Sequence, residues 1–239
     1  MNVNSFKLTT GKGCDGMLGF LTDYQISFLE KVLFPALGAT FQMLFISTAI
    51  STVSGLMVAV LMVITDKHGI FENKYIYTAI NFLVNVIRSF PFIILVVFIL
   101  PFTKTLVGSS IGVKAAVVPL VIAATAFIAK IIESSLKEVD ADLLKAMRSF
   151  GLTDTQLIFK VMFSEAMPSI ISGIILATVA ILGSTAMAGS LGAGGIGAVA
   201  LTYGYQSFNK PVMILTVIIL IVLVQIIQGL GNFVYRKLK

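Results

Sequence analysis

The sequence is short of the residues that carry most protein chemistry and most surface charge. Its 239 residues include no tryptophan, one cysteine (Cys14) and one histidine (His68), and only 12% are charged. One cysteine excludes an intrachain disulfide and a thiolate metal cluster. One histidine, beside Asp66 and Lys67 in a short polar loop, cannot supply the usual hydrolase or metal sites. We therefore expect no catalytic residue and no metal site in this chain.

Hydrophobic residues dominate instead. They make up 57% of the chain, and the mean hydropathy is +1.01. A soluble domain carries roughly 25% charged residues, about twice the fraction present in this chain, and a water-soluble fold could not bury so much apolar surface. The solvent of this protein is therefore a lipid bilayer. The net charge of +6 indicates membrane orientation rather than nucleic-acid binding.

The apolar runs predict an all-α membrane protein with about five transmembrane helices. A helix that crosses about 30 Å of hydrocarbon needs roughly 20 apolar residues. Five runs meet this requirement, at residues 41–64, 80–100, 111–132, 169–188 and 212–234. They form one transmembrane domain, residues 33–239, preceded by an N-terminal extension, residues 1–32. Residues 17–33 combine apolar helical spacing with Asp23, Glu30 and Lys31, which predicts an interfacial helix.

Basic residues are concentrated between alternate spans, and lysine and arginine favour the cytoplasmic side of a membrane. The largest groups follow the first span, occupy the loop between the third and fourth spans, and end the chain: Lys67, Lys74, Lys137, Lys145, Arg148, Lys160, Arg236, Lys237 and Lys239. This distribution predicts that the C-terminus and the long loop, residues 133–165, are cytoplasmic. With an odd number of spans, the N-terminus is then outside.

The first, second and fifth spans carry polar side chains at helical spacing. On the first span, serines share one helix face with a glycine, which predicts close packing against another helix: Ser47, Ser51, Ser54 and Gly55. On the second span, Asn81 and Asn85 are followed at the same spacing by Arg88. An arginine near hydrocarbon needs a partner or a watery cavity. Because Ser89-Phe90-Pro91 follows, we expect Arg88 at a kinked helix end, at the cytoplasmic interface.

The loop between the third and fourth spans is long enough for short helices outside the membrane. Asp140 or Asp142 can cap a first helix, and Gly151 can end it. Thr153 with Gln156 forms a capping box that starts a second helix. The apolar residues of the first helix recur on one face: Leu143, Met147 and Phe150. From periodicity alone, these helices are either a folded lid or a docking surface.

The run Lys145-Ala146-Met147-Arg148-Ser149-Phe150-Gly151 is followed nine residues later by Val161-Met162-Phe163-Ser164. This arrangement resembles the EAA loop of ABC importer permeases, which reads Glu-Ala-Ala, three residues, Gly, nine residues, then Ile-x-Leu-Pro. Lys145 stands where that family has glutamate, Met147 replaces alanine and Ser164 replaces proline. At Lys145 we therefore expect either a compensating acid on the partner or a weaker contact.

Much of the remaining chain is similar to the methionine-uptake permeases of that family. The similarity is carried by Val86-Ile87-Arg88-Ser89-Phe90-Pro91 and its continuation to Leu95, by Ala188-Gly189-Ser190-Leu191-Gly192 and its continuation to Gly197, and by residues 101–103, 107–112 and 203–205. It covers roughly residues 34–239. It therefore concerns the whole expected transmembrane domain and leaves the N-terminal extension aside.

The resemblance implies a homodimer in a bacterial inner membrane, with a translocation path between the two copies. Two copies of a cytoplasmic ATPase, which bind ATP and Mg²⁺, would receive the loop helix, and a substrate-binding lipoprotein would dock outside. The docking residues expected on the loop helix are Leu143, Lys145, Ala146, Met147, Arg148, Phe150 and Gly151. The implied cargo is methionine, with another small amino acid as the alternative.

The residues themselves independently indicate that the energy source is a partner. Gly11-Lys12-Gly13 lacks the upstream glycine and the following Ser or Thr of a phosphate-binding loop. No expected span has an interior Asp, Glu or His for a coupling ion, because Glu133 stands at a helix edge. The alternatives are an ion-coupled carrier and a membrane enzyme or scaffold whose loop recruits an unrelated protein.

Three residues are candidates for the translocation path or its gate. Met187, near the outer end of the fourth span, could close a path by apolar contact or simply fill space as a flexible side chain. Asn85 and Arg88 are the polar candidates on the second span. The glycine-rich segment at residues 189–197 is expected near the path or its outer mouth. It serves there for close packing, for a re-entrant turn or for direct substrate contact.

Overall fold

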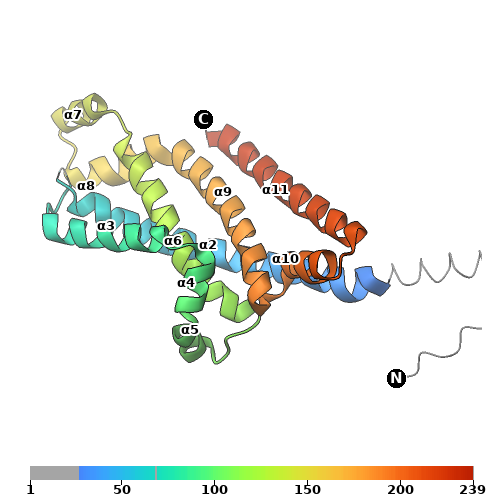
Figure 1. Ribbon diagram of the computed structural model, residues 1–239. Coiled ribbons are helices and arrows are strands. Elements are labelled where there is room, and N and C mark those ends of the chain that lie inside the picture. The colour runs from blue at the N-terminus through green and yellow to red at the C-terminus, as the bar shows by residue number, and fades with distance from the viewer. Residues whose placement is uncertain (1–26, 68, 239) are drawn as a thin grey trace, which may run out of the picture.

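The computed structural model describes residues 27–67 and 69–238, and all regular structure within them is helical (Figure 1). His68 and most of the expected interfacial helix lie outside these residues. The described part of that helix, from Ser27, runs through η1 (Leu29–Leu33) into α2 (Phe34–Thr65) without a break. The expected boundary between residues 32 and 33 is therefore inside one helix, because Leu33 keeps helical backbone angles.

Four helical segments of the described chain are long and apolar enough to cross a membrane: Leu29–Thr65, Val113–Lys137 (α6), Asp154–Ala193 and Lys210–Lys237. The third contains α9 (Phe163–Ala188), and the fourth corresponds to α11 (Lys210–Leu238). The expected second span is not one straight helix. It is divided into α3 (Lys74–Ser89) and α4 (Phe92–Phe98), bent by 106°. Counting the bent pair as one span gives the predicted five.

The bend between α3 and α4 is caused by Pro91, where the sequence predicts a kinked helix end. Pro91 has no N–H for a helical hydrogen bond and disfavours helical angles in the residue before it, and Phe90 is extended with ψ 129°. Arg88 lies in the last turn of α3. The loop that carries Lys74 lies at the other end of that helix, so Arg88 cannot lie at the same membrane face as this loop. The helix end was predicted correctly, but Arg88 and the loop with Lys74 cannot both lie at the cytoplasmic interface, contrary to the expectation from the sequence.

The serine-lined face of α2 packs against α6, as the sequence predicts. Ser47 and Ser51 are fully buried, and the hydroxyl groups of Ser54 and Thr125 are 2.7 Å apart. A Cβ added to Gly55 would lie 2.8 Å from the Ile128 side chain. Only a small residue allows this approach, so this pair of helices forms the centre of the bundle.

The loop between α6 and α9 is shorter than predicted. α6 ends at Lys137, α7 spans Ala141–Ser149, and α8 begins at Asp154. α8 (Asp154–Gln156) and η2 (Leu157–Met162) then continue into α9. The capping box at Thr153 and Gln156 is present, but the second short helix was a wrong prediction, because the apolar run carries the helix straight into the membrane span.

The remaining elements lie toward the other end of the bundle. They are α5 (Leu100–Val107), η3 (Gly189–Ala193), α10 (Gly195–Val199) and η4 (Ala200–Gln206). The glycine-rich segment is closely packed, as one of its three interpretations predicts. A Cβ on Gly197 would lie 2.3 Å from the Cα of Ala186, and the Ile196 N–H donates to the Thr40 hydroxyl at 2.9 Å. In Figure 1, α7 and the C-terminus lie at the opposite end from α5.

Candidate functional site

The loop helix α7 is defined by caps at both ends. The Asp140 carboxylate accepts a hydrogen bond from the Asp142 N–H at 2.8 Å, as expected for an N-cap. At the other end, the Gly151 N–H donates to the Arg148 carbonyl at 3.0 Å and the Leu152 N–H to the Met147 carbonyl at 3.4 Å. This is a Schellman motif, and Gly151 adopts its left-handed conformation with φ 86°. The predicted start and end of this helix are confirmed.

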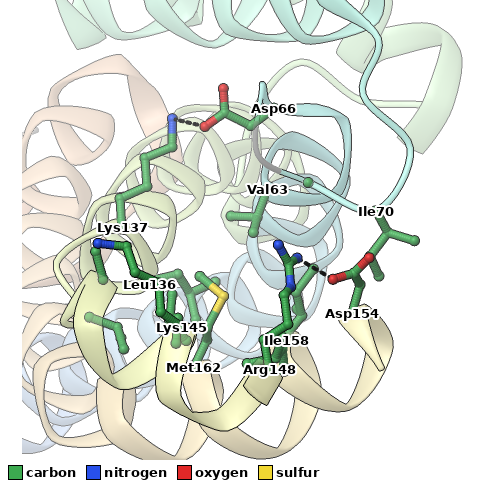
Figure 2. A pocket seen from close by; sticks show the side chains of 15 residues that line it. Val63, Asp66, Ile70, Leu136, Lys137, Lys145, Arg148, Asp154, Ile158 and Met162 are labelled. Carbon is green, nitrogen blue, oxygen red and sulfur yellow. Dashed lines mark hydrogen bonds and ion pairs between the residues drawn. The ribbon is translucent and has the colours of Figure 1, made fainter. Parts of the chain in front are cut away.

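A cavity of about 410 Å³ lies between α7, the ends of α2 and α6, and the α8–η2 segment that leads into α9. Figure 2 shows its apolar side chains, including Leu136, Ile158 and Met162, and the charged groups among them. Lys137 and Asp66 form one ion pair at 3.0 Å, and Arg148 and Asp154 form another. The second pair ties α7 to the first turn of the helix that continues into α9.

The predicted docking residues divide between two sides of α7. Lys145 and Arg148 line the cavity, where Lys145 pairs with Asp142 on its own helix at 2.8 Å. Leu143, Met147 and Phe150 are absent from the cavity lining, and Phe150 is 79% exposed. No residue of α7 is buried. A lid would bury its apolar row against the bundle, whereas Leu143 and Met147 are only half-buried and Phe150 is free for another protein.

A buried carboxylate beside this cavity was missed by sequence reasoning. Glu133, expected at a helix edge, is only 1% exposed. It pairs with Lys130 at 2.7 Å and with Lys137 at 2.8 Å, and it accepts a hydrogen bond from the Tyr77 hydroxyl at 2.8 Å. The lysines three residues before and four residues after Glu133 were the available sequence signal, because all three side chains share one helix face.

The Glu133 cluster connects three helices at the α7 end of the bundle. Lys137 bonds to Asp66 at the end of α2 and to the Tyr77 hydroxyl from α3. Lys130 also donates to Asn81 on α3 at 3.1 Å. Lys137 belongs to both the cluster and the cavity lining. The cluster therefore contributes a charged side chain to the cavity that α7 also lines.

The three path candidates do not meet in one cavity. Asn85 lines a shallow groove along α3, together with Asn81 and Ser89. Arg88 lines a separate cavity between α3, α4, α6 and α9. Met187 is 52% exposed near the end of α9 and lines neither of these. Among the described residues, no group of His, Cys, Asp or Glu side chains could hold a metal ion.

Comparison with known proteins identifies the class of this membrane protein. Residues 52–239 match the family described as the binding-protein-dependent transport system inner membrane component. The match covers more than half of the chain, so the chain belongs to this family of multi-pass membrane permeases.

The names of individual relatives also specify a transported substrate. The chain is 41% identical over 208 residues (87% of this chain, 92% of the relative) to a probable D-methionine transport system permease of Vibrio cholerae. It is 41% identical over 174 residues (73% and 78%) to the methionine import system permease of Bacillus subtilis. Its structure resembles a chain of the inward-facing MetNI methionine ABC transporter with a TM-score of 0.84, at 37% identity, over 88% of this chain and 98% of that one.

Proposed function

We propose that this chain is the transmembrane permease subunit of an ATP-driven importer for methionine. Family membership and the methionine relatives support the class and the cargo. The likeness to a chain of the MetNI methionine ABC transporter supports assembly of two copies of this chain with two copies of a cytoplasmic ATPase. A substrate-binding lipoprotein completes the proposed system outside the membrane. ATP and Mg²⁺ are bound by the ATPase in this proposal.

The way in which α7 is held by its neighbours supports a role in coupling the ATPase to the membrane spans. The helix is capped at both ends and joined to the helix that contains α9 by the Arg148–Asp154 pair. Its apolar row includes the exposed Phe150 and lies outside the cavity lining. A rigid helix held in this way can pass movement of an ATPase to the membrane spans. Leu143, Met147 and Phe150 enter the ATPase cleft. Lys145 is engaged with Asp142 in the free chain, and it meets an acidic residue of the ATPase on docking.

The proposal is tested by reconstitution with the ATPase and the lipoprotein in proteoliposomes. We expect methionine uptake only when ATP and both partners are present. The Phe150→Ala variant should bind the ATPase roughly tenfold more weakly or worse, because a central aromatic anchor is lost. Phe45→Ala, which removes a side chain 78% exposed on α2, is the matched control and should transport normally. Uphill uptake by the chain alone, driven by an imposed ion gradient, would refute the proposal.

A further inference from the structure

Arg88 is an exposed cation in the last turn of α3. It lies 14 positions after Lys74 on α3, which places it roughly 21 Å along the helix at 1.5 Å per residue. The hydrocarbon of a bilayer is only about 30 Å thick. Among the described residues, none forms a hydrogen bond or ion pair with the Arg88 guanidinium. An arginine at such depth faces water or an anion.

The cavity that Arg88 lines has the size and chemistry of a small-molecule site. Its volume of about 280 Å³ is near the lower end for ligand pockets, roughly 300 Å³. Besides Arg88, the lining contains one hydroxyl, that of Ser184, and apolar side chains that come mainly from the middle of α6 and α9: Ile87, Phe90, Phe92, Leu120, Ala123, Ala124, Phe127, Ala177, Ala180 and Ile181. The cavity therefore combines one fixed positive charge with apolar walls.

The helices that line the cavity supply no anion at this depth. The sequence contains no Asp or Glu between residues 74 and 130 or between residues 166 and 239. Glu133 is already paired with two lysines. Glu165 lies 19 positions before Ser184, roughly 28 Å along the helix. A second copy of the chain has the same acid-free stretches, so dimerisation adds no carboxylate from residues 74–130 or 166–239 either.

We propose that this cavity binds the amino-acid cargo during its passage, with the cargo carboxylate on the Arg88 guanidinium. Arginine can hold a carboxylate through two parallel hydrogen bonds. The apolar side chain of the cargo lies among Leu120, Phe127 and Ala177. The Ser184 hydroxyl donates to the Ala180 carbonyl at 3.1 Å and keeps lone pairs that accept from the cargo ammonium. The ligand class is a monocarboxylate amino acid with an apolar side chain. This assignment rests on the proposed import function.

The experiment measures equilibrium binding of L-methionine and of methioninamide, which lacks the carboxylate, to the permease–ATPase complex in nanodiscs without the lipoprotein. The wild type should bind methionine and reject the amide. Arg88→Gln should lose about 10- to 100-fold in methionine affinity, as expected for a charge-assisted hydrogen bond, and should no longer discriminate against the amide. Any methionine bound by the ATPase itself is the same in all variants, so differences between variants report binding to the permease. Lys104→Gln, which removes a cation outside the cavity lining, is the matched control and should match the wild type.

Two results would overturn this assignment and leave the import function intact. One is equal binding of methionine and methioninamide by the wild type. The other is an Arg88→Gln complex that still takes up methionine and keeps the wild-type affinity and discrimination. Failure of the import function has a different signature, because a wild-type complex supplied with ATP and the lipoprotein would then accumulate no methionine at all. Elution of each variant as a single folded complex excludes misfolding as the cause of lost binding.

Discussion

At the scale of single residues, the Glu133 cluster determines how the α7 end of the bundle is held together. A carboxylate with 1% exposure is tolerated because two lysines and the Tyr77 hydroxyl surround it. The lysines themselves keep part of their solvent contact, with 28% and 37% of their side chains exposed. Removal of the shared acceptor leaves both cations close together near the hydrocarbon, where an unpaired charge is costly.

We therefore expect Glu133→Gln to destabilise the protein by about 3 kcal/mol, the lower end of the range for breaking a buried ion pair, because both lysines reach solvent. The thermal unfolding midpoint of the detergent-solubilised chain measures this effect. Glu138→Gln, at an exposed position just beyond the end of α6, is the control and should change the midpoint little. Equal midpoints for the two variants would show that the cluster adds no stability.

At the scale of elements, α7 illustrates which signals can be read locally. Asp140, Gly151 and the Thr153 capping box act through hydrogen bonds within a few residues, so their sequence patterns predict the helix start and end directly. The ion pair between Arg148 and Asp154 was not predicted. It depends on the angle at which the chain returns into α8, and no short pattern specifies that angle.

Gly151→Ala should loosen α7 without unfolding the bundle. An alanine at φ 86° costs about 1–2 kcal/mol, which corresponds to roughly 5- to 30-fold faster local opening. Hydrogen–deuterium exchange of the α7 amides should report that increase, with little change in α6 and α9. Gly183→Ala introduces a Cβ into open space within α9 and is the matched control. Unchanged exchange in α7 would mean that the glycine cap does not limit its opening.

At the scale of the whole molecule, basic residues are more numerous at the α7 end of the bundle than at the opposite end. The end with α7 also carries the end of α11, with Arg236 and Lys237 (Figure 1). The opposite end has Lys104 on α5 and Lys210 at the start of α11. Since lysine and arginine are retained on the cytoplasmic side, the whole arrangement has one favoured orientation in the membrane.

Single cysteines introduced into a Cys14→Ser background should reveal this orientation. Ser149→Cys at the end of α7 should react with an impermeant maleimide only in inside-out vesicles. Ser109→Cys, in the turn after α5, should react only in right-side-out cells. Both residues are exposed, so burial does not limit labelling, and a permeant maleimide gives the total reactive amount. The opposite labelling pattern would reverse the proposed topology.

Composition and neighbouring residues were enough to specify part of this protein. Apolar length specified the membrane helices, because hydrocarbon thickness imposes a minimum length on each span. Local hydrogen-bonding side chains specified the caps of α7, and Pro91 specified the helix break. Helix packing was needed to establish the 106° bend, the cavity under α7, the burial of Glu133 and the isolation of Arg88. Each of these depends on which helices lie side by side, and that relation joins residues far apart in the chain.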